Sequence, residues 1–370
     1  MASVLEQKEK RVDAEKLLSF VKQVFKRLGV PEEDAGVTAD VLVQADLRGI
    51  ESHGVARISR YVDRIRQNKI EAKPKIRVLA ETPSTLLIDG GNGLGQVVGV
   101  YAIRRCIDKA KASGACFASV RNSNHFGIAG YYSMMALKSH MIGISMTNAW
   151  PLVTPTYGRK AMFGTNPISI AVPAEHRMPF VLDMATSVVP IGKIEVYERR
   201  GEKVPLGWGA GRDGVPTTDP SAIRTGGFLM PLGGTAENAG YKGYGLAVMV
   251  DILSGVLSGA AYGPFVGAPD SKEPCNIGHF FGAIRIDAFR PEEDFGRDMD
   301  NLITVLKEAP KAAGQTRIYV AGEKEFEMER RLRAEGIPLH PNVYANLEKL
   351  ARELEVPLEI DIGTASVKRR

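Results

Sequence analysis

The sequence predicts an α+β fold, with a mixed, largely antiparallel sheet flanked by helices and a helical subdomain beside it. Three observations support this prediction. The first seventy or so residues show helical periodicity, strands and helices then mix without a clean βαβ repeat, and charge-rich helical patterns close the chain. We expect a helical subdomain over 1–75 that later helices join, an α+β domain over 76–330, and a C-terminal helical segment over 331–370 that packs back.

Three helices are predicted in the first subdomain. Asp13 is placed to cap a helix that runs to Leu28, and a second helix opens at Pro31 with acidic residues in its first turn. Ser52 is expected to be the N-cap of a third helix. The apolar residues of this third helix share one face at helical spacing: Val55, Ile58, Tyr61, Val62 and Ile65. The first seventy residues should therefore be all helical.

Strands and helices alternate irregularly through the rest of the chain. The predicted strands cover residues 75–80, 84–89, 116–121, 142–148, 280–286 and 316–320, with two more inside 161–173 and 180–184. The predicted helices cover 96–112, 246–257, 292–308, 324–335 and 342–354, with a further one from about 128. A Gly- and Pro-rich passage over 201–240 is expected to form irregular surface structure or a clamp over a site.

Composition favours a globular enzyme. The 370 residues are 44% hydrophobic, and 48 Lys and Arg are mixed with 43 Asp and Glu, giving a net charge of +5. This mixture suits an enzyme with anionic ligands better than a dedicated nucleic-acid binder. The three cysteines lack metal-binding spacing, so we expect reduced thiols in a cytoplasmic protein. The polar N-terminus does not resemble a signal peptide, and the apolar run over 244–262 contains Asp251, which favours a buried helix over a membrane span.

Two glycine-rich segments approach a dinucleotide fingerprint, and neither satisfies it. The segment from Gly91 to Gly95 lies between a strand and a helix, but its glycines do not match G-x-G-x-x-G. The segment from Gly209 to Gly214 matches the pattern, but Val-Pro-Thr-Thr-Asp-Pro follows it, where a helix is required. Both are better explained as turns. A dinucleotide would therefore bind outside an ordinary Rossmann unit.

The segment from Asp46 to Tyr61 holds the residues most suited to chemistry. His53 and Arg57 are four apart, so in a helix they project from one side. An imidazole exchanges a proton near neutral pH, and a guanidinium binds a carboxylate through two hydrogen bonds. Those groups would hold an α-keto acid and protonate its carbonyl oxygen. The structural alternative is a helix start with a capped histidine and a solvated arginine.

Four further polar segments are candidates for ligand binding. His125 lies in a loop between a predicted strand and helix, where ligands commonly bind. The segments 164–167, 183–187 and 240–243 offer amide donors, hydroxyls and Lys242. Each alone is more often a turn or a cap, but together they could line a nicotinamide dinucleotide site. His140, His279 and His340 have no special neighbours in sequence, and no histidine pair has metalloenzyme spacing, so no metal site is expected.

Together these segments resemble the type-2 malate/L-lactate dehydrogenase family. The resemblance rests on residues 46–57, 122–132, 164–167, 182–187 and 240–246, and it covers the chain from about Val12 to Leu358. It implies a fold unrelated to Rossmann dehydrogenases, a homodimer or higher homo-oligomer with the site near the subunit interface, and NAD as cofactor, with NADP as the alternative. The sequence looks most similar to the malate dehydrogenases of this family.

The resemblance also implies roles for particular residues. Ser52, His53, Arg57 and His125 form the predicted catalytic group, with His53 matching a proton donor and His125 an acid/base. The predicted substrate-binding residues are Arg57, Tyr61 and Asn148, and nearby Trp150 stands where substrate choice would vary. The predicted cofactor-binding residues are Asn124, Thr165, Asn166, Asp183, Met184, Ala185, Lys242, Gly243, Gly322 and Glu323.

The expected reaction is hydride transfer between a nicotinamide and a 2-hydroxy or 2-keto acid, with malate and oxaloacetate favoured. One alternative keeps the family and changes the substrate to lactate, sulfolactate, ureidoglycolate or a cyclic imine. A remote alternative is a nucleic-acid-binding module built on the basic residues of 57–69, but these wrap around the predicted helix. Lys193, Arg199 and Arg200 could bind an NADP 2′-phosphate or form a solvated face. No nucleic-acid or membrane partner is expected.

Overall fold

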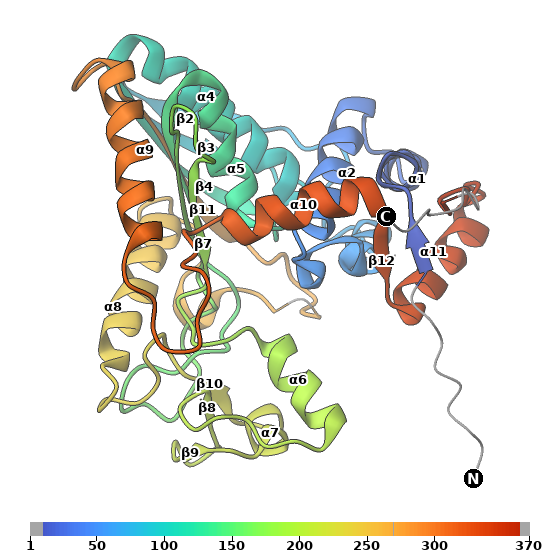
Figure 1. Ribbon diagram of the computed structural model, residues 1–370. Coiled ribbons are helices and arrows are strands. Elements are labelled where there is room, and N and C mark those ends of the chain that lie inside the picture. The colour runs from blue at the N-terminus through green and yellow to red at the C-terminus, as the bar shows by residue number, and fades with distance from the viewer. Residues whose placement is uncertain (1–9, 269, 363–370) are drawn as a thin grey trace. The chain divides into compact units, whose positions relative to one another are not determined.

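The computed structural model describes residues 10–268 and 270–362, which form two compact units (Figure 1). One unit combines the chain up to Lys73 with the chain from Glu323 onward, and the other runs from Pro74 to Gly322. Each unit is described by itself below.

The first unit is a helical cluster closed by a two-stranded sheet. Helix α1 packs against α2 and α11, and α10 packs against α2. Strand β1 pairs antiparallel with β12, which joins the two ends of the chain. Asp13 caps α1 as predicted, because its carboxylate accepts the Lys16 N–H at 2.9 Å. The elements are β1 (Lys10–Val12), α1 (Ala14–Arg27), α2 (Glu32–Leu47), α3 (Ile58–Arg66), α10 (Glu323–Glu335), β12 (Ile337–Leu339) and α11 (Pro341–Leu354).

Two predictions for this unit are wrong. The first seventy residues are not all helical, because β1 finds its partner in β12 more than three hundred residues later, which no local pattern reveals. Ser52 is not the cap of α3: two 3₁₀ turns, Glu51–His53 and Val55–Arg57, precede this helix. The extended backbone of Gly54 separates the turns, and the carboxylate of Asp46, not Ser52, accepts the Val55 N–H. The predicted apolar face of α3 is buried.

The second unit is built on a seven-stranded mixed sheet of order β2-β3-β4-β11-β5-β6-β7. The pair β3–β4 is parallel and every other neighbouring pair is antiparallel. The predicted α+β fold with a largely antiparallel sheet is therefore confirmed. The strands are β2 (Arg77–Glu81), β3 (Thr85–Asp89), β4 (Ala115–Ser123), β5 (Met141–Thr147), β6 (Ile168–Val172), β7 (Phe180–Met184) and β11 (Ile277–Arg285).

Helices cover this sheet from both sides. Helix α4 (Gly95–Ser113) packs on β4 and β11, and α5 (Ala129–Met135) packs on β5 and β6. On the other face, α8 (Gly240–Asp251) contacts β5, and its π-helical continuation, Ile252–Val256, contacts β4 and β11. Helix α9 (Glu292–Glu308) contacts the loop between β6 and β7, where Asp300 accepts the His176 N–H at 2.9 Å. Because α8 begins at Gly240, the segment predicted to precede this helix forms its first turn.

The Gly- and Pro-rich passage contains more regular structure than predicted. The passage contains helix α7 (Pro220–Arg224) and a three-stranded sheet of order β10-β8-β9. Together with the preceding helix α6 (Ile191–Arg200) they surround their own apolar core. Its strands are β8 (Gly209–Ala210), β9 (Pro216–Thr217) and β10 (Phe228–Leu229). The predicted strand over 316–320 is wrong: these residues are irregular, and the neighbouring Ala321 makes one backbone hydrogen bond, to Val181 of β7.

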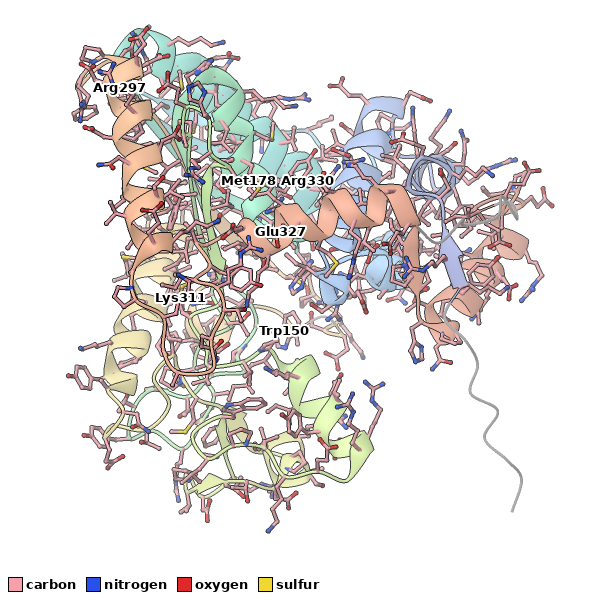
Figure 2. All side chains as sticks on the ribbon, viewed as in Figure 1. Trp150, Met178, Arg297, Lys311, Glu327 and Arg330 are labelled. Atoms are coloured by element: carbon pink, nitrogen blue, oxygen red, sulfur yellow. The ribbon has the colours of Figure 1, made fainter. Side chains whose placement is uncertain are left out.

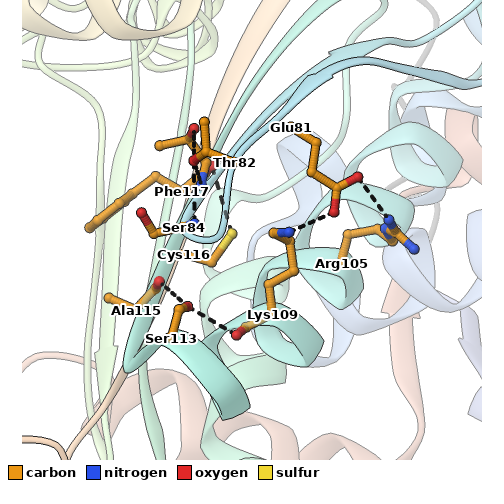
Figure 3. A network of polar contacts seen from close by, with 10 residues as sticks. Glu81, Thr82, Ser84, Arg105, Lys109, Ser113, Ala115, Cys116 and Phe117 are labelled. Atoms are coloured by element: carbon orange, nitrogen blue, oxygen red, sulfur yellow. Dashed lines mark hydrogen bonds and ion pairs between the residues drawn. The ribbon is translucent and has the colours of Figure 1, made fainter.

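The three cysteines are buried and free. Cys116 lies on β4 near a surface network in which Glu81 accepts a hydrogen bond from Lys109 at 2.6 Å and pairs with Arg105 at 3.6 Å (Figure 3). Within the described part of the chain, no helix is long and apolar enough to cross a membrane.

Candidate active site

In the first unit, the predicted catalytic residues Ser52, His53 and Arg57 lie on the two consecutive 3₁₀ turns and are linked by hydrogen bonds. The Ser52 hydroxyl lies 2.9 Å from Nδ1 of His53, and the Nε–H of Arg57 donates to the Ser52 carbonyl at 2.6 Å. The second bond fixes the plane of the guanidinium. Its two terminal nitrogens make no hydrogen bond or ion pair with residues 10–268 or 270–362, so the fork is available to a carboxylate.

The charge state of His53 follows from its surroundings. Burial lowers its pKa to about 4, and the positive charges of Arg57 and Arg60 act in the same direction. The ring is therefore neutral at pH 7 before an anion binds. The Ser52 hydroxyl can donate to Nδ1 of the neutral ring or accept from the protonated ring, so it orients His53 in both states. Tyr61, one turn along α3, is 2% exposed.

In the second unit, the end of β7 gathers predicted cofactor-binding residues. Asp183 faces the first turn of α5 and accepts the Gly130 N–H at 2.7 Å. Met184 and Ala185 follow Asp183 along the chain, and Met184 pairs with Ile168 of β6. Gly322 has a left-handed φ of +90° and packs so closely on Val181 that an added Cβ would lie 2.9 Å from the Val181 Cβ.

The remaining predicted cofactor segments adjoin this strand end. Thr186 donates from its N–H to the Thr165 carbonyl at 2.8 Å and accepts, through its own carbonyl, the Leu232 N–H at 2.8 Å. Leu232 in turn packs on Gly243 of α8, where an added Cβ would lie 2.2 Å from the Leu232 oxygen. Asn166 is fully buried and donates to the Ala247 carbonyl of α8 at 3.0 Å. Lys242 is exposed in the first turn of α8.

The loop after β4 holds His125 and Asn124 close to the start of α4. Asn124 is buried, and its amide nitrogen donates to the Gly93 carbonyl at 2.9 Å. Its Oδ1 has no hydrogen-bond partner in the described structure. Nδ1 of His125 accepts the Gly127 N–H at 3.4 Å. Gly95 admits no side chain, because a Cβ there would lie 2.1 Å from the Asn124 carbonyl oxygen.

Asn148, predicted to bind substrate, uses its side chain inside the protein. It is 1% exposed, and its amide nitrogen donates to Asp251 at 2.9 Å and to the Ala261 carbonyl at 2.8 Å. Its Oδ1 accepts the Gly278 N–H at 3.0 Å. These bonds tie the end of β5 to the loop after α8. Trp150, two residues further on, is labelled in Figure 2.

The sequence analysis did not include His279 among the candidate residues, because its neighbours in sequence are not distinctive. The structure buries this residue completely on β11, between two hydroxyl groups and against an aromatic ring. A signal existed: a histidine inside a strand of apolar residues needs buried hydrogen-bond partners. Such partners come from other strands, so their identity could not be read from the neighbouring sequence.

Three polar features of the second unit suit a dinucleotide. They are the Asp183 carboxylate at the end of β7, the buried Asn124 oxygen without a partner in the loop after β4, and Lys242 on the first turn of α8, where the helix dipole favours anions. Glu323 opens α10 in the other unit and is 4% exposed. Among the described residues, no group of three or more His, Cys, Asp or Glu side chains is placed to bind a metal ion.

Comparison with known proteins shows the family of this chain. The model of the malate/L-lactate dehydrogenase family matches residues 12–348. The chain belongs to this family. Its members include the malate dehydrogenase of Pyrococcus horikoshii, which is 50% identical over 348 residues, covering 94% of this chain and 96% of the relative. The solved structure of malate dehydrogenase from Pyrococcus horikoshii OT3 matches with a TM-score of 0.89 and 45% identity, over 96% of this chain and 99% of that chain.

More distant members of the malate/L-lactate dehydrogenase family carry other substrate names. The L-sulfolactate dehydrogenase of Methanocaldococcus jannaschii is 42% identical, covering 91% of this chain and 95% of the relative. The ureidoglycolate dehydrogenase (NAD(+)) of Escherichia coli is 31% identical, with the same coverage of 91% and 95%. The predictions of family and of a dehydrogenase are thus confirmed, and two of the alternative substrates, sulfolactate and ureidoglycolate, occur among relatives.

Proposed function

We propose that this dehydrogenase transfers a hydride reversibly between a nicotinamide cofactor and C2 of a 2-hydroxy or 2-keto acid, with malate and oxaloacetate as its substrate pair. The observation that carries the proposal is the turn that joins Ser52, His53 and Arg57. It places a guanidinium, whose two terminal nitrogens make no hydrogen bond or ion pair with the described residues, in the same segment as a histidine whose ring is held by a hydroxyl. The 50% identity to a malate dehydrogenase supports the choice of substrate.

In the proposed mechanism, Arg57 holds the C1 carboxylate of the substrate through its two terminal nitrogens. In the oxidative direction, neutral His53 removes the hydroxyl proton, and its pKa of about 4 keeps it in that form at pH 7. In the reductive direction the protonated ring donates, and the substrate carboxylate on Arg57 favours this form because it offsets part of the positive charge that adds to the effect of burial on the His53 pKa. His125 shares this proton transfer or orients the substrate oxygen.

The cofactor supplies or accepts the hydride when bound. We propose that the predicted cofactor-binding residues contact it. The hydrogen bond of Asp183 and the close packing at Gly243 and Gly322 support this proposal, because they hold those segments in place. We propose NAD, with NADP as the alternative, because a relative at 31% identity is named for NAD(+). The protein contributes the alignment of two bound reactants.

We also propose that the protein is a cytoplasmic homodimer or higher homo-oligomer. Helix α8 and the residues after it expose a run of large apolar side chains, including Val256 at 53% and Phe265 at 71%. Exposed apolar surface of this kind commonly marks a protein interface. Three free, buried thiols support a reducing compartment.

The test is nicotinamide absorbance during turnover, with NADH and NADPH in parallel, against oxaloacetate, pyruvate and sulfopyruvate. Rapid oxidation with oxaloacetate is expected. Faster turnover of sulfopyruvate would move the substrate while keeping the roles of His53 and Arg57. Inactivity with all three acids, together with no cofactor binding by fluorescence, would contradict the proposal.

A further inference from the structure

His279 occupies a central position in the seven-stranded sheet. It lies on β11, opposite Val120 of β4 on one side and Thr147 of β5 on the other. The register between β11 and β4 shifts between Ile277 and His279, which marks a β-bulge. Bulges re-aim side chains and are frequent beside active sites.

Both nitrogens of the His279 ring are engaged. Nδ1 lies 2.7 Å from the Thr147 hydroxyl, and Nε2 lies 2.8 Å from the Ser123 hydroxyl. The Thr147 hydroxyl also donates to the Gly278 carbonyl at 3.1 Å, so it accepts from Nδ1–H, and the Ser123 hydroxyl donates to Nε2. Complete burial lowers the His279 pKa to about 3, so this neutral arrangement holds at every ordinary pH.

The ring also supports the loop that follows β4. Phe126 stacks on His279 with ring centroids 4.8 Å apart and an angle of 4° between the planes. The other face of this stack is closed by Tyr132, whose ring lies 4.7 Å from Phe126 and whose hydroxyl donates to the Phe126 carbonyl. Ser123 and Phe126 flank His125 in sequence, so His279 holds the loop on both sides of it.

We propose that His279 is a positioning residue for His125: it fixes the loop through the Ser123 hydrogen bond and the Phe126 stack. This inference rests on the proposed role of His125 in proton transfer. The competing explanation is a core histidine that stabilises the sheet without acting on the site. The two explanations differ in whether the effect of losing His279 passes through His125.

Two substitutions separate the two sides of the ring. In His279→Gln the amide reaches the position of Nε2 and keeps the bond with Ser123, whereas in His279→Asn it reaches only the position of Nδ1 and keeps Thr147. We expect kcat to fall about 10- to 100-fold in His279→Asn, because small misplacements of catalytic groups have effects of this size, and to fall much less in His279→Gln. The substrate KM should change little in either. His140→Asn, at an exposed histidine on the same unit, is the matched control.

A double-mutant cycle with His125→Gln tests whether the effect passes through His125. That variant alone should lose about 10²–10⁴-fold in kcat. In its background, His279→Asn should cost less than about twofold more, since no imidazole is left to misplace. Equal losses in both backgrounds would overturn the proposal. If His125→Gln is fully active, the role of His125 in the proposed function fails instead.

A second readout does not depend on turnover. In protein with isotope-labelled histidine rings, His279→Asn should move the NMR signals of the His125 ring, identified by their absence from His125→Gln. His279→Gln, which keeps the Ser123 bond but loses the stack, should move those signals less, and His140→Asn should leave them in place. Unmoved His125 signals in a folded His279→Asn variant would overturn the proposal even if no substrate were turned over.

Discussion

The carboxylate of Asp46 and the backbone of Val55 are joined by a buried hydrogen bond of 2.8 Å. The bond closes the segment that contains His53, because Asp46 lies in the last turn of α2 and Val55 begins the 3₁₀ turn before α3. Gly54 lies directly against the same carboxylate: a Cβ on Gly54 would be 1.9 Å from Oδ1. The geometry of the His53 turn therefore depends on a carboxylate and a glycine that neither bind nor react.

Gly54→Ala should destabilise the protein and reduce turnover together. The added Cβ has to displace the buried carboxyl group of Asp46, and overpacking of this kind costs about 1–3 kcal/mol. Urea denaturation measures the loss. Gly36→Ala is the control, since a Cβ there meets nothing closer than the Lys22 Cε at 3.9 Å and helix α2 should gain about 0.5–1 kcal/mol. Equal stability of the two variants would contradict this account of Gly54.

Asp46→Asn should remove a pH dependence of stability. Burial raises the Asp46 pKa from 3.8 to about 8, and the charge of Glu51 adds to the rise. Between these pH values the unfolded chain has lost a proton that the folded protein retains, so the free energy of unfolding should fall as the pH rises from about 4 to about 8. The slope from one such group is at most about 1.4 kcal/mol per pH unit.

The measurement is the free energy of unfolding against pH for Asp46→Asn and for the native protein. The difference between the two curves reports Asp46, because the other groups titrate in both proteins. Asparagine still accepts the Val55 N–H, so the variant should match the native protein near pH 4 and exceed it near pH 8. Parallel profiles across this range would show that Asp46 is ionised in the folded protein.

His53→Gln should lower kcat about 10²–10⁴-fold and leave cofactor affinity unchanged, as expected for the loss of a proton-transfer group. In the native enzyme, kcat/KM for reduction should rise as the pH falls, because reduction uses the protonated ring. For oxidation, kcat/KM should hold down to a pH near the His53 pKa of about 4. Lost cofactor binding with normal turnover per bound cofactor would show that His53 has another role.

Val256→Glu should disrupt the proposed homo-oligomer. Val256 lies on the π-helical continuation of α8 and is 53% exposed, so a carboxylate there is tolerated by the single chain but would be buried in an apolar interface. Light scattering after size exclusion should show a fall in mass. Val215→Glu, at a site 60% exposed between β8 and β9, is the control. An unchanged mass in Val256→Glu would remove this surface from the interface.

The sequence predicted the elements whose signals are local. Asp13 caps α1, the apolar positions of α3 are buried, and the failed glycine fingerprint agrees with a sheet that has one parallel pair. The errors involve partners distant in sequence. Strand β1 exists because β12 pairs with it, and the His53 turn is capped by Asp46 instead of the adjacent Ser52.

The same distinction applies to the candidate site. The residue types and spacing around His53 and Arg57 suggested their chemistry, and Ser52 makes a hydrogen bond with each of them. The roles of the surrounding asparagines and of His279 could not be predicted in this way. Each of these side chains makes its hydrogen bonds to other strands and helices. The sequence does not show which donors and acceptors of a side chain are already paired inside the protein.

Asn148 was predicted from the sequence to bind substrate, but the structure pairs its side chain inside the protein, so it tests which of the two holds. All of its side-chain bonds are internal, and one goes to Asp251, whose pKa is raised by burial while the bonds from Asn148 and Gly263 oppose the rise. Asn148→Ala leaves buried polar groups without partners, so the free energy of unfolding should fall by about 2–4 kcal/mol. Asn301→Ala, on the exposed face of α9, should stay within about 0.5 kcal/mol of the native protein.

Kinetics of Asn148→Ala distinguish a structural role of Asn148 from a role in substrate binding. If Asn148 only ties β5 to the loop after α8, the KM for the keto acid should stay near the native value at temperatures where the variant remains folded. A substrate contact would instead raise KM about tenfold or more, the cost of one lost hydrogen bond to a charged group. Asn148→Asp adds a second check: its carboxylate would face Asp251, so its instability should grow as the pH rises and both groups ionise.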